Sequence, residues 1–182
     1  MTVLELALVN PKVRKPSRST LVLAFLFLLL FFTFPLMSSL AEEPAASAPL
    51  DPVAQTRHTL LSRINEIRAS YGLHPYGMNE RLVQAAQGHV ADMRARGYMS
   101  HWGSDGSGYY DRVYRTGYVA GKVNEAIGWG YNMERMLNWW LNSRVHRQIL
   151  LSPLYTEIGI GYLGNPERRG GHWWTVNVAT HR

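Results

Sequence analysis

Histidine and carboxylate side chains are the groups that could carry chemistry in this chain, because its 182 residues include seven histidines and no cysteine. The absence of cysteine excludes disulfides, thiolate metal sites and a cysteine nucleophile. None of the histidines has the His-Glu-x-x-His spacing that places two imidazoles on one face of a helix. A site built from these histidines must therefore be assembled by the fold from distant parts of the chain.

One local arrangement, Ser104-Asp105 shortly after His101, contains the three side-chain types of a hydrolytic triad. Such a triad also needs an oriented base and an oxyanion hole, and no nucleophile elbow surrounds Ser104. The segment over residues 98–108 is rich in Gly and Ser, which favours an Asx turn at Asp105. The sequence therefore does not favour a serine hydrolase.

The helices that must position these groups follow from hydrophobic periodicity. One helix is predicted over residues 56–72 and a second over residues 79–97, each closed by a glycine. A short helix is expected over residues 109–115, and a third long helix begins after its cap, Asn132. The apolar faces of the three long helices carry Leu60, Leu61, Ile64, Ile67, Leu82, Ala85, Ala86, His89, Met93, Met136, Leu137, Trp140 and Leu141.

The period changes near the C-terminus, where apolar residues alternate over residues 158–163 and again over residues 174–179. This alternation predicts an antiparallel hairpin. Gly159 and Gly161 leave one face of its first strand bare, so another element should pack closely there. Residues 118–129 are expected to be irregular with one short strand. Helices beside strands indicate an α+β class, built as a layered α-β-α sandwich.

An uncharged apolar run over residues 21–34 follows a basic segment, and small residues stand at Ser39 and Ala41. This pattern predicts a signal peptide cleaved after Ala41. An uncleaved anchor is the alternative, because the run extended to Leu40 reaches the ~20 residues needed to span a bilayer. In both cases residues 1–41 form the export segment, and the domain lies outside the cytoplasm.

Residues 42–55 are rich in Pro and Ala, which predicts a linker, and residues 56–180 are expected to form the domain. The whole chain has a formal charge of +6, yet from Glu42 onward there are 15 basic and 12 acidic residues. The arginines are scattered rather than clustered. We therefore expect no nucleic-acid partner, and membrane contact only through the N-terminal segment.

Six segments follow one another in order between Arg57 and Val178. They are LSRINEIR at 61–68, NERL at 79–82, GYMSHWGSDGS at 97–107, DR at 111–112, SRVHR at 143–147 and YTEIGIG at 155–161. Together they resemble the CAP superfamily, which comprises cysteine-rich secretory proteins, antigen 5 and plant pathogenesis-related proteins. The missing cysteines are similar to its bacterial, extracellular SCP-like branch. The resemblance implies a three-layer α-β-α sandwich of the CAP type with a mainly antiparallel sheet.

The resemblance also implies a site, because histidines and acids of this family line a cleft that can take a divalent metal. The matching residues are His101, Glu125 and His146, although the motifs around the last two depart from the family pattern. Two neutral imidazoles and one carboxylate would leave an open position on Zn²⁺ or another divalent cation. His172 is a lesser candidate, because it stands one place out of register with the family's strand histidine, and such a slip reverses the face.

Structural roles are the alternative for each candidate. His101 could bond the backbone of its loop, Glu125 could pair with an arginine, and His146 could cap the third helix. Among the aromatic residues, Trp140 belongs to the core by its spacing, whereas Trp139 and Trp173 could line a groove for an apolar or sugar ligand.

These observations favour a secreted or membrane-tethered binding module whose cleft holds a divalent metal, a small apolar or lipid-like molecule, or a cell-envelope component. Two alternatives stay open. One is a metal-dependent hydrolase of peptides or envelope polymers, with Glu125 as the general base for a metal-bound water. The other is an adhesion or scaffold domain without a functional cleft.

Overall fold

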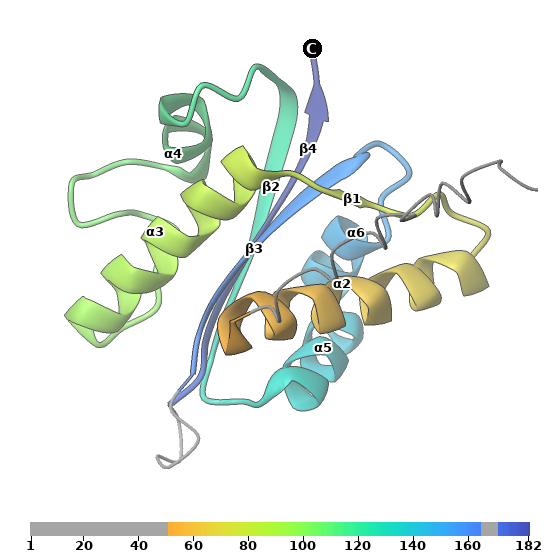
Figure 1. The fold of residues 1–182 in the computed structure, drawn as a ribbon, viewed down its shortest axis with the longest axis horizontal. Helices are drawn as coiled ribbons and strands as arrows, with labels where there is room; N and C mark the ends of the chain where they lie inside the picture. Colours follow the sequence, from red (N-terminus) through yellow and green to blue (C-terminus); the bar gives the residue numbers. More distant parts are fainter. Residues whose placement is uncertain (1–50, 165–170) are drawn as a thin grey trace, which may run out of the picture. The chain divides into compact units, whose positions relative to one another are not determined.

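The computed structural model describes residues 51–164 and 171–182, which belong to the compact unit Ala48–Arg182 (Figure 1). The predicted export segment and most of the predicted linker lie outside the described residues. In the part that is described, none of the helices is both long enough and apolar enough to cross a bilayer.

Four strands form one mixed sheet in the order β1-β3-β4-β2. β2 (Ala120–Trp129) and β3 (Glu157–Leu163) both pair antiparallel with β4 (Trp173–His181). The two-residue β1 (Gly77–Met78) pairs parallel with β3. The expectation of a mainly antiparallel sheet, and of a hairpin formed by its last two strands, is thus confirmed.

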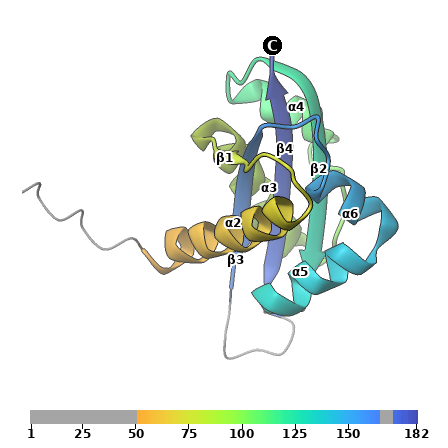
Figure 2. The same ribbon diagram turned by 90° about the vertical axis from the view of Figure 1, so that its right-hand side faces the viewer.

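Helices cover both faces of this sheet. On one face lie α3 (Glu80–Arg96) and α4 (Tyr109–Arg115), and on the other lie α2 (Pro52–Ser70), α5 (Met133–Asn142) and α6 (Arg144–Leu150). Figure 2 shows α2, α5 and α6 on the near side of the strands and α3 behind them. The α+β class and the three-layer α-β-α sandwich predicted from the sequence are confirmed.

α3 forms as its sequence predicts. The Asn79 side chain accepts hydrogen bonds from the backbone N–H groups of Arg81 and Leu82, which satisfies donors that the first turn leaves free. Gly97 closes the helix in the left-handed region at φ +74°, where glycine is favoured. All five residues predicted for its inner face are buried: Leu82, Ala85, Ala86, His89 and Met93.

Gly159 and Gly161 of β3 lie directly beneath α3. A Cβ atom at Gly159 would overlap the backbone of Leu82 and Val83, and one at Gly161 would overlap the backbone of Ala86. The close packing predicted for this bare strand face is confirmed. Because α3 lies this close to β3, its inner face is fixed relative to the neighbouring strands.

The two faces of the sheet differ in chemistry. The face under α2, α5 and α6 holds one continuous apolar core, which includes Trp140, Trp174 and Ile160. The opposite face holds two smaller apolar clusters, one around Leu82 and one around Met93. That face also carries four buried polar side chains from α3, β2 and β4: His89, Glu125, Thr175 and Asn177.

Three boundaries differ from the sequence prediction. α2 begins at Pro52, inside the predicted linker, because Asp51 caps it and proline suits a first helical position. The expected short strand is the ten-residue β2. The third long helix is two helices, since Ser143 is extended at φ −87° and ψ 121° and the chain turns there.

Candidate functional site

Glu125 lies at the centre of the candidate site. It occupies β2 on the face that meets α3, beside Asn177 of β4, and its side chain is 0 % exposed. A carboxylate in such a place needs partners for its charge. Its Oε2 accepts a hydrogen bond from Arg112 at 2.7 Å, and its Oε1 accepts one from His101 Nδ1 at 2.8 Å.

Arg112 connects the loop to the sheet. It lies on the short helix α4, and its side chain is 10 % exposed. Besides the bond to Glu125, its guanidinium donates to the carbonyls of His101 at 3.1 Å and Ser107 at 2.8 Å. The Arg112 guanidinium thus neutralises the charge of the buried Glu125 and holds the backbone of the loop that carries His101.

His101 presents one edge of its ring to Glu125 and the other outward. Because a carboxylate can only accept, His101 donates through Nδ1–H, so in the neutral imidazole the Nε2 atom carries the free lone pair. The side chain is 48 % exposed. A carboxylate–imidazole contact of this kind is typical of histidines that bind metal through their second nitrogen.

His146 lies on α6 and faces the same region. Its Nδ1 is 2.8 Å from Ser143 Oγ, and its ring packs against Trp139 with 4.9 Å between centroids. Burial lowers its pKa, and the charge of His101 lowers it further. The two imidazoles are therefore near enough to interact electrostatically, and both effects favour the neutral form of His146.

His89 lies behind the site on α3 and is fully buried. Its Nε2–H donates to the Ser100 carbonyl at 2.7 Å, and the same nitrogen is 3.9 Å from Glu125 Oε1. Burial lowers the pKa of this histidine, while its Nδ1 has no hydrogen-bond partner. His89 thus supports the loop from which His101 projects, as a neutral core histidine.

Two imidazoles, His101 and His146, are the side chains of the site that could donate to a cation. Within residues 51–164 and 171–182, no group of three or more His, Cys, Asp or Glu side chains is arranged to hold a metal ion. Glu125 already has both oxygens engaged, so its place is behind His101 rather than beside it. Direct ligation by His101, Glu125 and His146 together therefore stays a prediction, and the geometry favours Glu125 as the orienting group.

His172 lies elsewhere. Its Nδ1 is 3.0 Å from the Tyr162 hydroxyl, its ring stacks on Tyr162, and it borders a cavity with residues of α2. It thus lies on the sheet face opposite to Glu125, as the one-residue slip implied.

Arg112 is the member of the site that the sequence analysis did not single out. A signal was present, because an arginine partner was one of the alternatives for Glu125 and Asp111-Arg112 was among the resembling segments. Only the fold shows which arginine it is.

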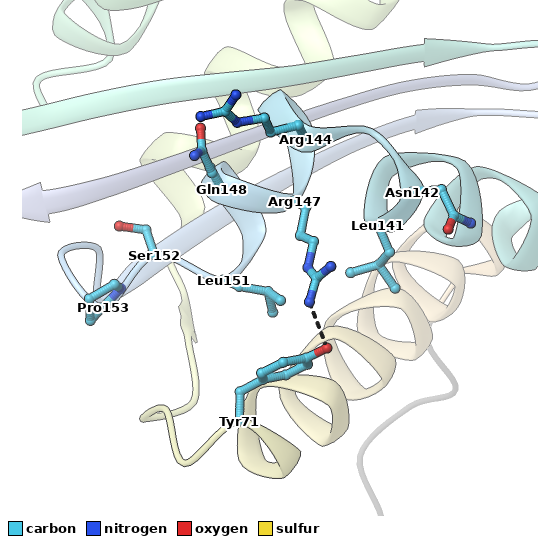
Figure 3. A pocket seen from close by; sticks show the side chains of 9 residues that line it. All are labelled: Tyr71, Leu141, Asn142, Arg144, Arg147, Gln148, Leu151, Ser152 and Pro153. Carbon is cyan, nitrogen blue, oxygen red and sulfur yellow. Dashed lines mark hydrogen bonds between the residues drawn. The ribbon is translucent and has the colours of Figure 1, made fainter.

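A larger cavity of about 660 Å³ opens between the end of α2 and the α5–α6 region, lined by Tyr71, Leu141, Asn142, Arg144, Arg147, Gln148, Leu151, Ser152 and Pro153. Figure 3 shows Arg147 reaching across it to the Tyr71 hydroxyl, at 3.0 Å. None of the candidate site residues lines this cavity, so it is a separate feature.

The sandwich, with its histidine loop bound to a buried glutamate and arginine, has the architecture of a CAP domain. The model of the cysteine-rich secretory protein family (CAP) matches residues 61–178, and the chain belongs to this family.

Individual proteins are similar to this chain in sequence or in structure. Uncharacterized protein YkwD of Bacillus subtilis (strain 168) is 28% identical over 130 residues, which cover 71% of this chain and 48% of that protein. An extracellular SCP-domain protein of Bacillus anthracis is similar in structure, with a TM-score of 0.63, 25% identity and coverage of 73% of this chain and 45% of that one. An outer surface protein of Borrelia burgdorferi has a TM-score of 0.67 at 20% identity, over 73% and 97% of the two chains. This chain spans only about half the length of the first two relatives.

Proposed function

We propose that this chain acts outside the cytoplasm as a binding module, and that His101 and His146 take up a divalent cation at the surface of the domain. The observation that carries the proposal is the contact between His101 Nδ1 and the buried Glu125 carboxylate. This contact fixes the ring and leaves the Nε2 lone pair free to bind a metal, while His146, whose pKa is lowered by burial, supplies a second imidazole from α6.

Glu125 favours this proposal over the metal-dependent hydrolase. A general base must accept a proton from a water that reaches it. The Glu125 side chain is sealed from solvent, and Arg112 and His101 occupy its two oxygens. Its role in the proposal is to orient His101 and to make that imidazole a better donor. A bound Zn²⁺ would supply Lewis acidity and a fixed positive charge for anionic or carbonyl groups of a ligand.

The extracytoplasmic location is supported by two independent lines. The names of two structural relatives describe an extracellular protein and an outer surface protein. The sequence itself carries a basic segment and an uncharged run over residues 21–34, which is the pattern of an export signal or anchor. Secretion and anchoring are equally compatible with the binding role.

The test is zinc titration of the full chain, purified in a detergent, with the unfolding temperature as the readout. The wild type should be stabilised as zinc is added, by up to ~2.7 kcal/mol at a hundredfold excess over the dissociation constant. His101→Ala and His146→Ala should each abolish the response. Glu125→Gln should weaken zinc binding by about 10- to 100-fold.

His74→Ala is the matched control, because His74 is an exposed histidine outside the site. It should respond to zinc as the wild type does. A wild type that ignores zinc, or a His101→Ala variant that responds fully, would contradict the metal proposal and leave the scaffold alternative.

A further inference from the structure

A cavity of about 200 Å³ opens where the end of β2 meets α5, and its lining residue Trp139 packs against His146. It is lined by Met99, Gly128, Trp129, Tyr131, Met136 and Trp139. Four of these side chains are also strongly exposed, at 47% for Trp129, 42% for Trp139, 40% for Met99 and 37% for Tyr131. Large apolar side chains gathered around one open cavity indicate a binding surface.

The aromatic rings of this groove are held by their neighbours. Trp129 stacks on Trp173, with ring centroids 5.2 Å apart and planes inclined by 26°. The Tyr131 carbonyl accepts a hydrogen bond from Trp174 at 2.9 Å, and the Arg135 guanidinium lies 4.8 Å from the centre of the Tyr131 ring. Because these positions are fixed in advance, a ligand would lose little free energy in ordering them. Trp173, which from the sequence could line a groove, is only 6% exposed and supports Trp129 from behind.

The floor of the groove is equally fixed. A Cβ atom at Gly128 would overlap the Met136 side chain, which is buried between α5 and the sheet. Only glycine at this position lets the methionine lie against the strand. The floor is therefore apolar, with exposed rings around it.

The groove continues into the candidate cation site at two points. Trp139 packs against His146 with 4.9 Å between ring centroids. Met99 lies two residues before His101 in the same loop. A molecule seated in the groove would thus lie next to His146 and to the loop that carries His101.

We propose that this groove binds a glycan built of pyranose rings with equatorial substituents, one sugar ring lying against Trp139 and Trp129. The inference rests on the proposed role of the chain as a binding module and names the chemical class of its ligand. A pyranose with equatorial substituents carries its hydroxyl groups around the rim of the ring and presents a flat face of C–H groups. That face matches the exposed indole rings of Trp129 and Trp139, and the surrounding hydroxyls match the Arg135 guanidinium, which lies over the neighbouring Tyr131 ring.

The dimensions favour a sugar chain over an acyl chain. Pockets that enclose a drug-sized ligand have volumes of roughly 300–1,000 Å³, whereas this groove has about 200 Å³ and partly exposed walls. It has room for one ring-sized unit of a longer molecule and cannot enclose a long apolar tail. A groove of this size is sufficient for a polysaccharide, because one sugar ring occupies it while the other rings stay in water.

The test is titration of the full chain with chitotetraose and with cellotetraose, in a detergent that has no sugar headgroup, followed by tryptophan fluorescence and calorimetry. Binding of either oligosaccharide should shift the emission. Trp139→Ala should weaken that binding by about tenfold or more, as the loss of one stacked ring implies, whereas Trp139→Phe should retain most of it. Trp102→Ala is the control, because Trp102 is an exposed tryptophan outside the groove.

The outcomes separate this inference from the cation proposal. Titrations are run with EDTA and again with zinc, on the wild type and on His101→Ala. Glycan binding lost in Trp139→Ala and retained in Trp102→Ala supports the groove, with or without a zinc response. No binding of either oligosaccharide by the wild type, or equal binding by the wild type and Trp139→Ala, overturns it. A zinc response that persists in that case leaves the cation site standing alone.

Discussion

Arg112 and Glu125 form an ion pair of 2.7 Å on the inner face of the sheet, and both side chains are largely or wholly removed from solvent. Removing one partner of such a pair leaves the other charge buried without compensation, at a cost of about 3–5 kcal/mol. Arg112→Ala should therefore lower the free energy of unfolding by that amount. Urea denaturation of wild type and variant measures the difference.

Arg115→Ala is the matched control for this prediction. Arg115 also lies on α4 and pairs with Asp105, but the two side chains are 58% and 52% exposed. An exposed pair contributes about 0–1 kcal/mol, so this variant should be nearly neutral. An equal decrease of the free energy of unfolding in the two variants would show that the buried pair contributes no more to stability than the exposed pair.

Gly159→Ala should be strongly destabilising, although it adds a single methyl group. The new Cβ would overlap the backbone of Leu82 and Val83, and backbone cannot swing aside as a side chain can. Overpacking of a core usually costs about 1–3 kcal/mol and occasionally more, and we expect the upper end of this range. The midpoint of thermal unfolding should fall accordingly. An unchanged midpoint would mean that α3 is not seated on β3 as described.

Gly88→Ala should have the opposite sign. Gly88 lies on the exposed side of α3, and nothing lies within 4 Å of a Cβ atom built there. Alanine is favoured over glycine in a helix interior by about 0.5–1 kcal/mol. The variant should therefore unfold at a higher urea concentration than the wild type. A loss of stability would indicate that the outer face of α3 packs against something in the full chain.

Much of the fold could be predicted from local signals, because those signals act over a few residues. Asn79 and Gly97 begin and end α3 through interactions with their own backbone neighbours. The two glycines of β3 predict that another element packs closely on the strand, but they do not identify that element. The length of β2 was underestimated from the sequence for a physical reason. Every second residue of β2 faces inward, and these residues are Val123, Glu125 and Ile127. A charged residue in the middle of this face interrupts the apolar pattern by which a strand is recognised.

The candidate site was less accessible to prediction, since its geometry depends on contacts between distant segments. The resemblance named His101 and Glu125, and the fold brings them together across 24 residues. It could not show that Arg112 saturates the carboxylate, which changes the role of Glu125 from ligand to orienting group. Nor could the sequence show that Trp173 is buried while Trp139 is exposed, because that depends on what packs over each ring.

The stability of the domain should depend on pH through His89. Burial lowers the pKa of this histidine in the folded state, so the unfolded chain, with an ordinary pKa of about 6.5, binds its proton first as the pH falls. Stability is then complete above that value and decreases below it. His146, whose pKa is also lowered, contributes in the same direction.

His89→Gln tests this linkage, since a glutamine amide can still donate to the Ser100 carbonyl but does not titrate. The wild type should lose stability between pH 6.5 and 5, with each such histidine adding a slope of up to ~1.4 kcal/mol per pH unit. The variant should show a smaller decline, with His146 accounting for part of what is left. Urea denaturation at several pH values in this window gives both slopes. Parallel curves for the two proteins would show that His89 takes up its proton as easily in the folded state as in the unfolded chain.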